Sequence, residues 1–408
     1  MLRRGYKGNR RSRIHRVDEY KIITSPVILN FMKIANLIVL LITFFVLLGC
    51  ESDGEEINLP TPLQEIESEV SGEILWKKKI LKNPIFGRFD IHFDDNFFYY
   101  ITSEGFLIKG DIRNGQEIWK KEISNSLSAG LGHSFRTLFA ASSDGDVFAL
   151  DDENGELKWQ ASVNTEVLSS PVANGRIVAV QSVDGRITAL DFKTGEFKWE
   201  YLAVIPQLTL RGTSEPYFSN NMLFIGFANG NLAMIDPDSG VVRWEIPLTL
   251  SEASSEFERI IDVDAKPIVT SGLAIGAAYQ GSISAIEIQS SRTVWRQDSS
   301  IFQDFISYRG DIFFVDQYDE IFSHRTVDGD LEWKNSELKY RELTKPIRYK
   351  NNLVVGDLEG FLHFVDLKTG SLVGRIQPTK NKLVSLFSQD NFLFGVDSKG
   401  ASFLLSVK

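Results

Sequence analysis

Short apolar or alternating runs recur along most of the chain, and turns rich in Gly, Asn and Asp separate them. In the segment that ends at Trp199 the runs read "SSPVANG", "RIVAVQS", "RITALD" and "EFKWEY". A two-residue period interrupted by pairs such as Asp184-Gly185 is typical of β-strands joined by tight hairpins. No 3.6-residue period is sustained, which argues against amphipathic helices.

This four-run pattern repeats, and all seven tryptophans mark the same place in it. Successive tryptophans are 43, 40, 40, 45, 51 and 38 residues apart, and a further copy, "TGSLVGRI", has Gly374 in the tryptophan position. Four short strands in each repeat of about 40 residues are typical of a β-propeller blade. A tryptophan on the outermost strand can cover the seam between blades and donate its N–H to a turn carbonyl. The tryptophans are Trp76, Trp119, Trp159, Trp199, Trp244, Trp295 and Trp333.

The two ends of the repeat region complete each other. The C-terminal run "ASFLLSVK" (401–408) is a third strand with no fourth, and "EILWKKKI" (73–80) is a fourth strand with no preceding three. Joining them removes two exposed sheet edges. We therefore predict an all-β fold, an eight-bladed β-propeller with four-stranded blades over residues 71–408, in which the N-terminal strand completes the C-terminal blade.

The region before the repeats has a different character. Residues 32–49 join a lysine to an apolar run of signal-peptide length, and Cys50 is the only cysteine. The sequence "LLGC" at 47–50 resembles the bacterial lipobox, which implies a lipoprotein signal peptide and a lipidated Cys50. A plain N-terminal membrane anchor is the alternative. Glu51 leaves sorting to the inner or outer membrane open.

Two further N-terminal segments differ in charge. Residues 1–31 are basic, which suits either a nucleic-acid-binding arm or, as we favour, an over-extended start upstream of Met32 that is not part of the mature protein. Residues 50–70 are acidic and polar with two prolines, and we expect them to form a flexible tether. Residues 1–49 hold nine Lys or Arg and two Asp or Glu, so the remainder carries about −17. That charge argues against nucleic acid as a partner and leaves the lipid anchor as the membrane attachment.

The repeat also raises the question of catalysis. Its "ALD…TG…W" pattern resembles the tryptophan-docking repeat of quinoprotein dehydrogenases, which bind pyrroloquinoline quinone and calcium. Those enzymes typically use an adjacent cysteine pair, and this chain has neither such a pair nor a C-x-x-C-H haem motif. Histidines are scattered singly, and no credible Ser/His/Asp set is present. We predict a non-catalytic protein without cofactor, metal site or catalytic residue, and keep the quinoprotein-like enzyme as the alternative.

The repeat is interrupted at two consecutive places. The longest tryptophan-to-tryptophan gaps precede Trp244 and Trp295, and the extra residues are "LAVIPQLTLRGTSEP" (202–216) and "IPLTLSEASSEFERIIDVDAKP" (246–267). Both lie between the last strand of one blade and the first strand of the next. Equivalent connections of adjacent blades lie side by side on one face, where insertions often form the binding surface.

These two insertions contain the candidate binding residues. In an extended segment Leu208 and Leu210 point the same way, and Arg211 adds a planar set of donors suited to an interface. Asp262 and Asp264 share one side of "DVD" and can present two carboxylates to a partner's Lys or Arg. The alternative is internal, with Arg211 paired to Asp262 or Asp264 and the leucines packed beneath. An extended segment could also add a strand to a partner.

Several motifs together resemble the BamB family of outer-membrane protein assembly factors. They are the lipobox, the eight repeats, "LTLRG" followed by "SEP", "ERIIDVD", "VDQYDEI" and "NLVVGDLEGFLH", and the resemblance spans essentially 50–408. It implies an outer-membrane lipoprotein that faces the periplasm and a scaffold role in the β-barrel assembly complex. The implied partner is the set of periplasmic POTRA domains of the barrel subunit BamA, with direct contact to unfolded outer-membrane proteins left open.

The resemblance also assigns roles to residues. The family's loop leucines and arginine correspond to Leu208, Leu210 and Arg211, and its two aspartates to Asp262 and Asp264. All five are thereby implied in the contact with BamA. A generic propeller lipoprotein with another partner is the second alternative.

Overall fold

The structure, a computed structural model, describes residues 58–80, 91–94, 96–102, 104–206, 214–249 and 262–408. The chain divides into two compact units, Met1–Asn58 and Leu59–Lys408, and the described residues belong almost entirely to the second. Within the described part, no helix is long and apolar enough to cross a membrane. The predicted signal peptide, Cys50 and the basic extension lie outside the described residues.

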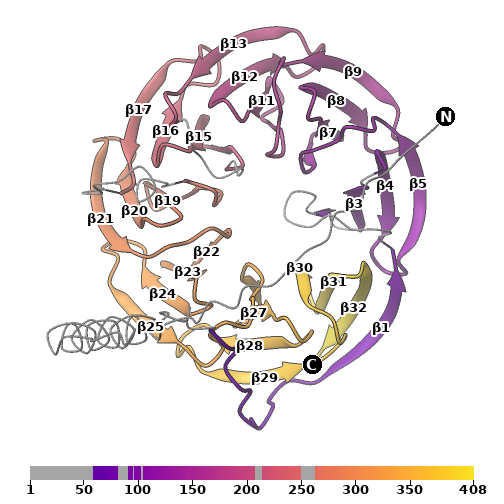
Figure 1. Ribbon diagram of the computed structural model, residues 1–408, viewed down its shortest axis with the longest axis vertical. Helices are drawn as coiled ribbons and strands as arrows, with labels where there is room; N and C mark the ends of the chain where they lie inside the picture. The colour runs from indigo at the N-terminus through magenta and orange to yellow at the C-terminus, as the bar shows by residue number, and fades with distance from the viewer. Residues whose placement is uncertain (1–57, 81–90, 95, 103, 207–213, 250–261) are drawn as a thin grey trace, which may run out of the picture. The chain divides into compact units, whose positions relative to one another are not determined.

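The second unit is a ring of eight antiparallel sheets of four strands each (Figure 1). In every blade the strands follow one another outwards, so that the fourth lies on the outer rim. Middle strands such as β7 (Thr137–Ala141) and β11 (Ile177–Gln181) are buried along their whole length, because neighbouring blades cover both of their faces. The predicted eight-bladed all-β propeller is confirmed.

Seven blades consist of four consecutive strands, and the eighth combines strands from both ends of the propeller. Blades 1 to 4 comprise β2 (His92–Asp94), β3 (Phe97–Ile101), β4 (Phe106–Asp111), β5 (Gln116–Glu122); β6 (Gly132–Ser134), β7, β8 (Asp146–Asp151), β9 (Leu157–Ser162); β10 (Val172–Ala173), β11, β12 (Arg186–Asp191), β13 (Phe197–Leu202); β14 (Tyr217–Ser219), β15 (Met222–Gly226), β16 (Asn231–Ile235), β17 (Val242–Pro247). Blades 5 to 8 comprise β18 (Ile268–Thr270), β19 (Leu273–Ala277), β20 (Ser282–Glu287), β21 (Arg292–Asp298); β22 (Ile306–Tyr308), β23 (Asp311–Val315), β24 (Ile321–Arg325), β25 (Leu331–Asn335); β26 (Ile347–Tyr349), β27 (Asn352–Gly356), β28 (Leu362–Asp366), β29 (Leu372–Ile376); β30 (Leu383–Gln389), β31 (Phe392–Asp397), β32 (Ala401–Val407) and β1 (Gly72–Lys79).

The ring closes as the sequence predicts. β1 pairs antiparallel with β32, from Gly72 opposite Val407 to Lys79 opposite Ala401. The fourth strand of blade 8 therefore comes from the N-terminal end of the propeller, and both β1 and β32 gain a hydrogen-bonded neighbour.

The tryptophans hold neighbouring blades together. Trp159 on blade 2 donates its indole N–H to the carbonyl of Phe192 on blade 3 at 2.9 Å. Its ring lies on Gly195, where a Cβ would come within 2.7 Å of the ring and where φ is +74°. Glycine is thus required twice at this turn, for its conformation and for the close approach. The same indole-to-carbonyl bond is made by Trp76, Trp199, Trp295 and Trp333.

Two tryptophans depart from this pattern. The indole N–H groups of Trp119 and Trp244 are buried and make no hydrogen bond to any described residue. At the seam of blades 1 and 2, the carbonyl of Asp152, which stands in the acceptor position, instead accepts a bond from Lys109 Nζ at 2.8 Å. At the seam of blades 4 and 5, Ser291 stands where other blades have the turn glycine. The seam of blades 4 and 5, which the second insertion spans, is therefore one of the two tryptophan-bearing seams that lack this bond among the described residues.

The segment expected to be a flexible tether is in part a strap on blade 7. Within its described residues, the backbone N–H of Glu69 bonds to the carbonyl of Val373 at 2.8 Å, and Val70 packs onto Gly374. A side chain at Gly374 would collide with Val70, because its Cβ would come within 1.9 Å. The strap thus occupies the place of the missing blade 7 tryptophan. The expected tether thus makes contacts within residues 61–70 that the sequence did not predict, because they are non-local and do not show in its composition.

Candidate functional site

The two insertions meet where they rejoin the blades. Ser214, at the described end of the first, donates its hydroxyl to the carbonyl of Ala265 in the second at 3.0 Å. One residue further along each segment, Lys266 Nζ pairs with Glu215 Oε1 at 2.5 Å. The prediction that the insertions lie side by side is confirmed for these described ends.

The pair of Glu215 and Lys266 belongs to a longer row of alternating charges. Glu215, Lys266, Asp304 and Lys345 each stand two residues before the first strand of blades 4, 5, 6 and 7. Asp304 accepts the backbone N–H of Lys266 at 2.9 Å and the ammonium of Lys345 at 3.2 Å. The row therefore links four blades. Sequence reasoning missed it, although the signal is visible as "EP", "KP", "DF" and "KP" at one repeat position.

The segment "DVD" spans the seam between blades 4 and 5. Val263 packs against Gly226 at the end of β15, where a Cβ would approach it to 2.2 Å. The carbonyl of Asp262 accepts the N–H of Tyr279, which follows β19, at 2.8 Å. Asp262 is only 1% exposed and Asp264 is half-buried. The expectation of two carboxylates displayed on the surface is therefore wrong for Asp262, because backbone pairing on both sides draws it inwards.

These two carboxyl groups form a buried acidic pair. Both Asp262 side-chain oxygens and Asp264 Oδ1 are buried and make no hydrogen bond to any described residue. Burial raises the pKa of Asp262, and the neighbouring charge of Asp264 raises it further; burial likewise raises the pKa of Asp264. An unpaired acidic pair of this kind binds a proton or a cationic group strongly.

The remaining predicted contact residues belong to the first insertion. Leu208, Leu210 and Arg211 lie in residues 207–213, outside the described part of the chain. The internal pairing of Arg211 with the acidic pair and the contact of Arg211 with a partner both stay predictions.

Comparison with known protein families identifies relatives of this chain. The model of the family described as "Outer membrane protein assembly factor BamB" matches residues 103–335. The BamB of Pseudomonas aeruginosa is 38% identical over 329 residues, which cover 80% of this chain and 87% of the relative. The chain belongs to the BamB family. With other relatives the match is shorter: the BamB of Shewanella oneidensis is 38% identical over 181 residues, 44% of this chain and about half of the relative at 46%.

Solved structures with this fold include BamB and enzymes. BamB from Moraxella catarrhalis superposes with a TM-score of 0.71 at 22% identity, over 80% of this chain and all of that one. The quinohemoprotein alcohol dehydrogenase from Comamonas testosteroni gives a TM-score of 0.64 at 12% identity, over 82% of this chain and 76% of that one. Both likenesses concern the fold alone, and the fold therefore does not decide between a BamB-like scaffold and an enzyme.

Blade 7 contains a buried carboxylate that, unlike the acidic pair, is hydrogen-bonded to basic side chains. Asp357 Oδ2 lies 2.9 Å from Nε of Arg341 and 2.9 Å from Nε2 of His363, and all three residues are buried. Burial alone would raise the pKa of Asp357, but the bonds from His363 and Arg341 hold it below its usual range. Arg341 also donates to the strap carbonyl of Thr61 at 2.9 Å, and Arg375 to that of Gln64 at 3.0 Å.

A polar row between blades 1 and 2 was also missed. His92, Tyr99, Lys109 and Trp119 lie opposite one another across the four strands of blade 1. The histidines are not isolated, because the rings of His92 and His133 meet edge to face at 5.1 Å. Burial, with the nearby His133, lowers the pKa of His92 to about 4, so His92 is neutral at physiological pH. The residues of this polar row are too far apart in the sequence for their spacing to reveal it.

Proposed function

We propose that this protein is a non-catalytic scaffold lipoprotein of the outer-membrane β-barrel assembly complex, anchored to the outer membrane through Cys50 and facing the periplasm. Its propeller binds the POTRA domains of the barrel subunit BamA and assists the insertion of outer-membrane proteins. Membership of the BamB family supports the assembly role, since the relatives carry that name. The lone cysteine at the end of an apolar N-terminal run supports the anchor.

One observation carries the location of the binding site. The buried pair of Asp262 and Asp264 has no counter-charge among the described residues and lies where the two insertions meet. Such a pair costs stability while it stays ionised and unpaired, and a cationic partner offsets that cost. We therefore propose that the POTRA contact involves this seam, and we keep Leu208, Leu210 and Arg211 of the first insertion as further predicted contact residues.

A capture experiment tests the proposal. Residues 51–408, which contain all eight blades, are immobilised and exposed to the purified POTRA domains of the barrel subunit from the same organism. We expect capture by the unmodified chain, weaker capture by Arg211→Ala and by the double variant Asp262→Ala/Asp264→Ala, and little change in melting temperature. Undiminished capture by both variants would refute the site, and failure of the unmodified chain to bind would refute the partner.

The quinoprotein fold neighbour gives the enzyme alternative its own test. Adding pyrroloquinoline quinone and calcium to the same chain, followed by absorbance and alcohol-dependent dye reduction, separates the two functions. We expect neither cofactor absorbance on the protein nor dye reduction. Turnover would contradict the scaffold role, and a generic propeller lipoprotein would bind neither the cofactor nor the POTRA domains.

A further inference from the structure

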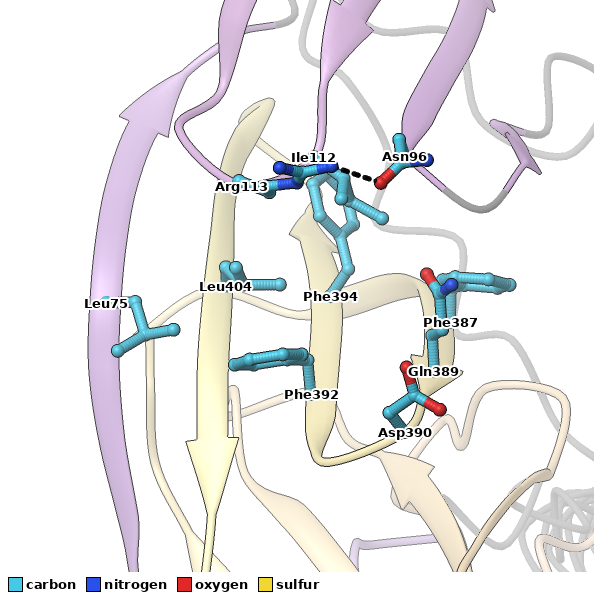
Figure 2. Close-up of a pocket in the computed structure, with 10 residues that line it drawn as sticks. All are labelled: Leu75, Asn96, Ile112, Arg113, Phe387, Gln389, Asp390, Phe392, Phe394 and Leu404. Carbon is cyan, nitrogen blue, oxygen red and sulfur yellow. Dashed lines mark hydrogen bonds between the residues drawn. The ribbon is translucent and has the colours of Figure 1, made fainter.

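The seam that closes the ring contains an apolar pocket. The pocket lies between blades 8 and 1 and has a volume of about 360 Å³ (Figure 2). Phe392, Phe394 and Leu404 of blade 8, with Leu75 of β1, point towards the same space. Phe392 and Leu75 are 40% and 47% exposed, so the apolar wall continues to the surface. A volume of this size lies at the lower end of the range for ligand pockets and has room for a large side chain.

The seam between blades 2 and 3 is equivalent to the seam that contains the pocket, and the two can be compared residue by residue. Register equates the two seams: Phe394, Leu404 and Trp76 lie opposite one another in blade 8, as Phe139, Ala149 and Trp159 do in blade 2. Trp76 docks on the carbonyl of Ile112, and Trp159 on that of Phe192. Ile112, which lines the pocket, therefore corresponds to Phe192.

A hairpin turn completes the correspondence. Phe135 follows β6 and Asp390 follows β30 at the same turn position, with φ of 49° and 50°. The Phe135 ring meets Phe192 edge to face at 5.9 Å, and Phe192 meets Phe139 at 5.8 Å. The seam between blades 2 and 3 thus has the phenyl rings of Phe135 and Phe192. The seam between blades 8 and 1 has Asp390 and Ile112 in those positions, together with the pocket. Phe135 is a bulky residue in a left-handed conformation and 65% exposed, which is unfavourable unless its ring contact compensates.

The rim of the pocket is polar and carries both charges. Arg113 forms one wall, where its guanidinium is held by Asn96 Oδ1 at 2.5 Å, and Asp390 stands on the blade 8 side (Figure 2). A guanidinium can donate to a peptide carbonyl, and a carboxylate can accept from a peptide N–H. The rim therefore suits the backbone on either side of a side chain inserted into the pocket.

We propose that this pocket binds one aromatic side chain of an extended polypeptide segment, in the position where Phe135 lies against Phe192 between blades 2 and 3. The inference rests on the proposed function in one respect, the source of the segment. Transmembrane β-barrel proteins carry girdles of aromatic residues along alternating strands, so their unfolded chains offer this kind of segment.

Filling the pocket from within tests the proposal. The probe is a short peptide of alternating threonine and serine with one central 4-fluorophenylalanine, observed by fluorine NMR with residues 51–408. We expect the resonance to shift and broaden with the unmodified chain, and Asp390→Phe, which copies the Phe135 arrangement, to weaken binding roughly tenfold or more. Arg309→Phe is the matched control, because Arg309 occupies the same turn position in blade 6 with a φ of 53° and should leave binding unchanged.

The outcomes separate this inference from the proposed function. Displacement of the probe by an unlabelled phenylalanine peptide but not by its alanine counterpart would support an aromatic pocket. Equal binding to the Asp390→Phe variant, or equal displacement by the alanine peptide, would overturn it, as would phospholipid vesicles that displace the probe from the unmodified chain. Capture of the POTRA domains should be unaffected by Asp390→Phe, so a failure of that capture bears on the proposed function and not on the pocket.

Discussion

Blades 5 and 7 place opposite charges at the same position of the repeat. The carbonyl of Asp262 accepts the N–H of Tyr279 after β19, and the carbonyl of Arg341 accepts the N–H of Leu358 after β27 in the same way. Both residues are buried, at 1% and 2% exposed. Arg341 meets Asp357 there, whereas the corresponding residue of blade 5 is the apolar Ala278.

The difference separates a structural cluster from a candidate binding site. The charge of Arg341 is met by Asp357 and by carbonyl groups of the strap, so the cluster holds blade 7 and the strap together. The Asp262 carboxyl group meets no described counter-charge, and the neighbouring Asp264 disfavours its ionisation further. Removing one partner from a fully paired buried charge is destabilising, whereas a buried carboxyl group without a counter-charge carries a desolvation cost that a cationic partner can offset.

The largest effect is expected from breaking the paired cluster. Arg341→Ala leaves the Asp357 carboxylate buried with one partner fewer and releases the strap at Thr61. We expect a loss of about 3–5 kcal/mol in the free energy of unfolding, measured with urea. Arg325→Ala, at an exposed ion pair of blade 6, is the control and should change stability little. A loss no larger than that of the control would remove the distinction between the two blades.

Neutralising the acidic pair of Asp262 and Asp264 should not lower the free energy of unfolding, in contrast to Arg341→Ala. In Asp262→Asn at pH 8 the repulsion with Asp264 disappears, and the new amide can donate to the Asp264 carboxylate. We expect unfolding free energy to stay constant or to rise by about 1 kcal/mol. Asp357→Asn is the matched variant in blade 7 and should be destabilising. A clear loss for Asp262→Asn would indicate that the chain itself supplies a counter-charge, with Arg211 as the first candidate.

The pH dependence of stability should differ between the two sites. Because folding raises the pKa of Asp262 and Asp264, their contribution is most favourable below the ordinary aspartate pKa of about 4 and is lost as pH rises towards neutrality and above. Because folding lowers the pKa of Asp357, its contribution is present above that range and is lost on acidification. Urea midpoints against pH should therefore decline less steeply on the alkaline side for Asp262→Asn than for the unmodified chain. Parallel profiles would contradict the raised pKa.

The smallest expected effect is the difference in stability between replacing a tryptophan whose indole N–H is hydrogen-bonded and replacing one whose N–H is not. Trp333→Phe removes a hydrogen bond to the carbonyl of Leu367, whereas Trp119→Phe removes a ring whose N–H has no described acceptor. We expect Trp333→Phe to cost about 1 kcal/mol more than Trp119→Phe, measured by thermal unfolding. Equal costs would show that ring packing alone holds the seams.

The regular part of the fold could be predicted because the sequence of each blade contains the same pattern of strands and turns. Trp199, Asp184-Gly185 and their counterparts repeat at nearly constant spacing, so strands, turns and ring closure follow from local sequence. The strap could not be predicted, because its acidic, proline-containing sequence gives no sign that Arg341 and Arg375 bind its carbonyl groups.

The meeting of the two insertions was predictable, whereas the burial of Asp262 was not. The long gaps before Trp244 and Trp295 locate the insertions, and the contact of Ser214 with Ala265 brings their ends together. Alternation within "DVD" suggested that both aspartates share an exposed side. Burial of Asp262 instead depends on its pairing with Tyr279 of blade 5 and on Val263 fitting against Gly226 of blade 4, and both contacts join residues that are distant in the sequence.

Calorimetric titration of the POTRA domains into the chain tests the central claim most directly. The variants are Asp262→Asn/Asp264→Asn at the unpaired site and Asp330→Asn, an exposed carboxylate of blade 6, as the control. We predict that the double variant binds at least roughly tenfold more weakly, with an unchanged melting temperature, and that the control binds normally. Equal affinity of the double variant and the unmodified chain would contradict the claim that the unpaired acidic pair is where this propeller binds its partner.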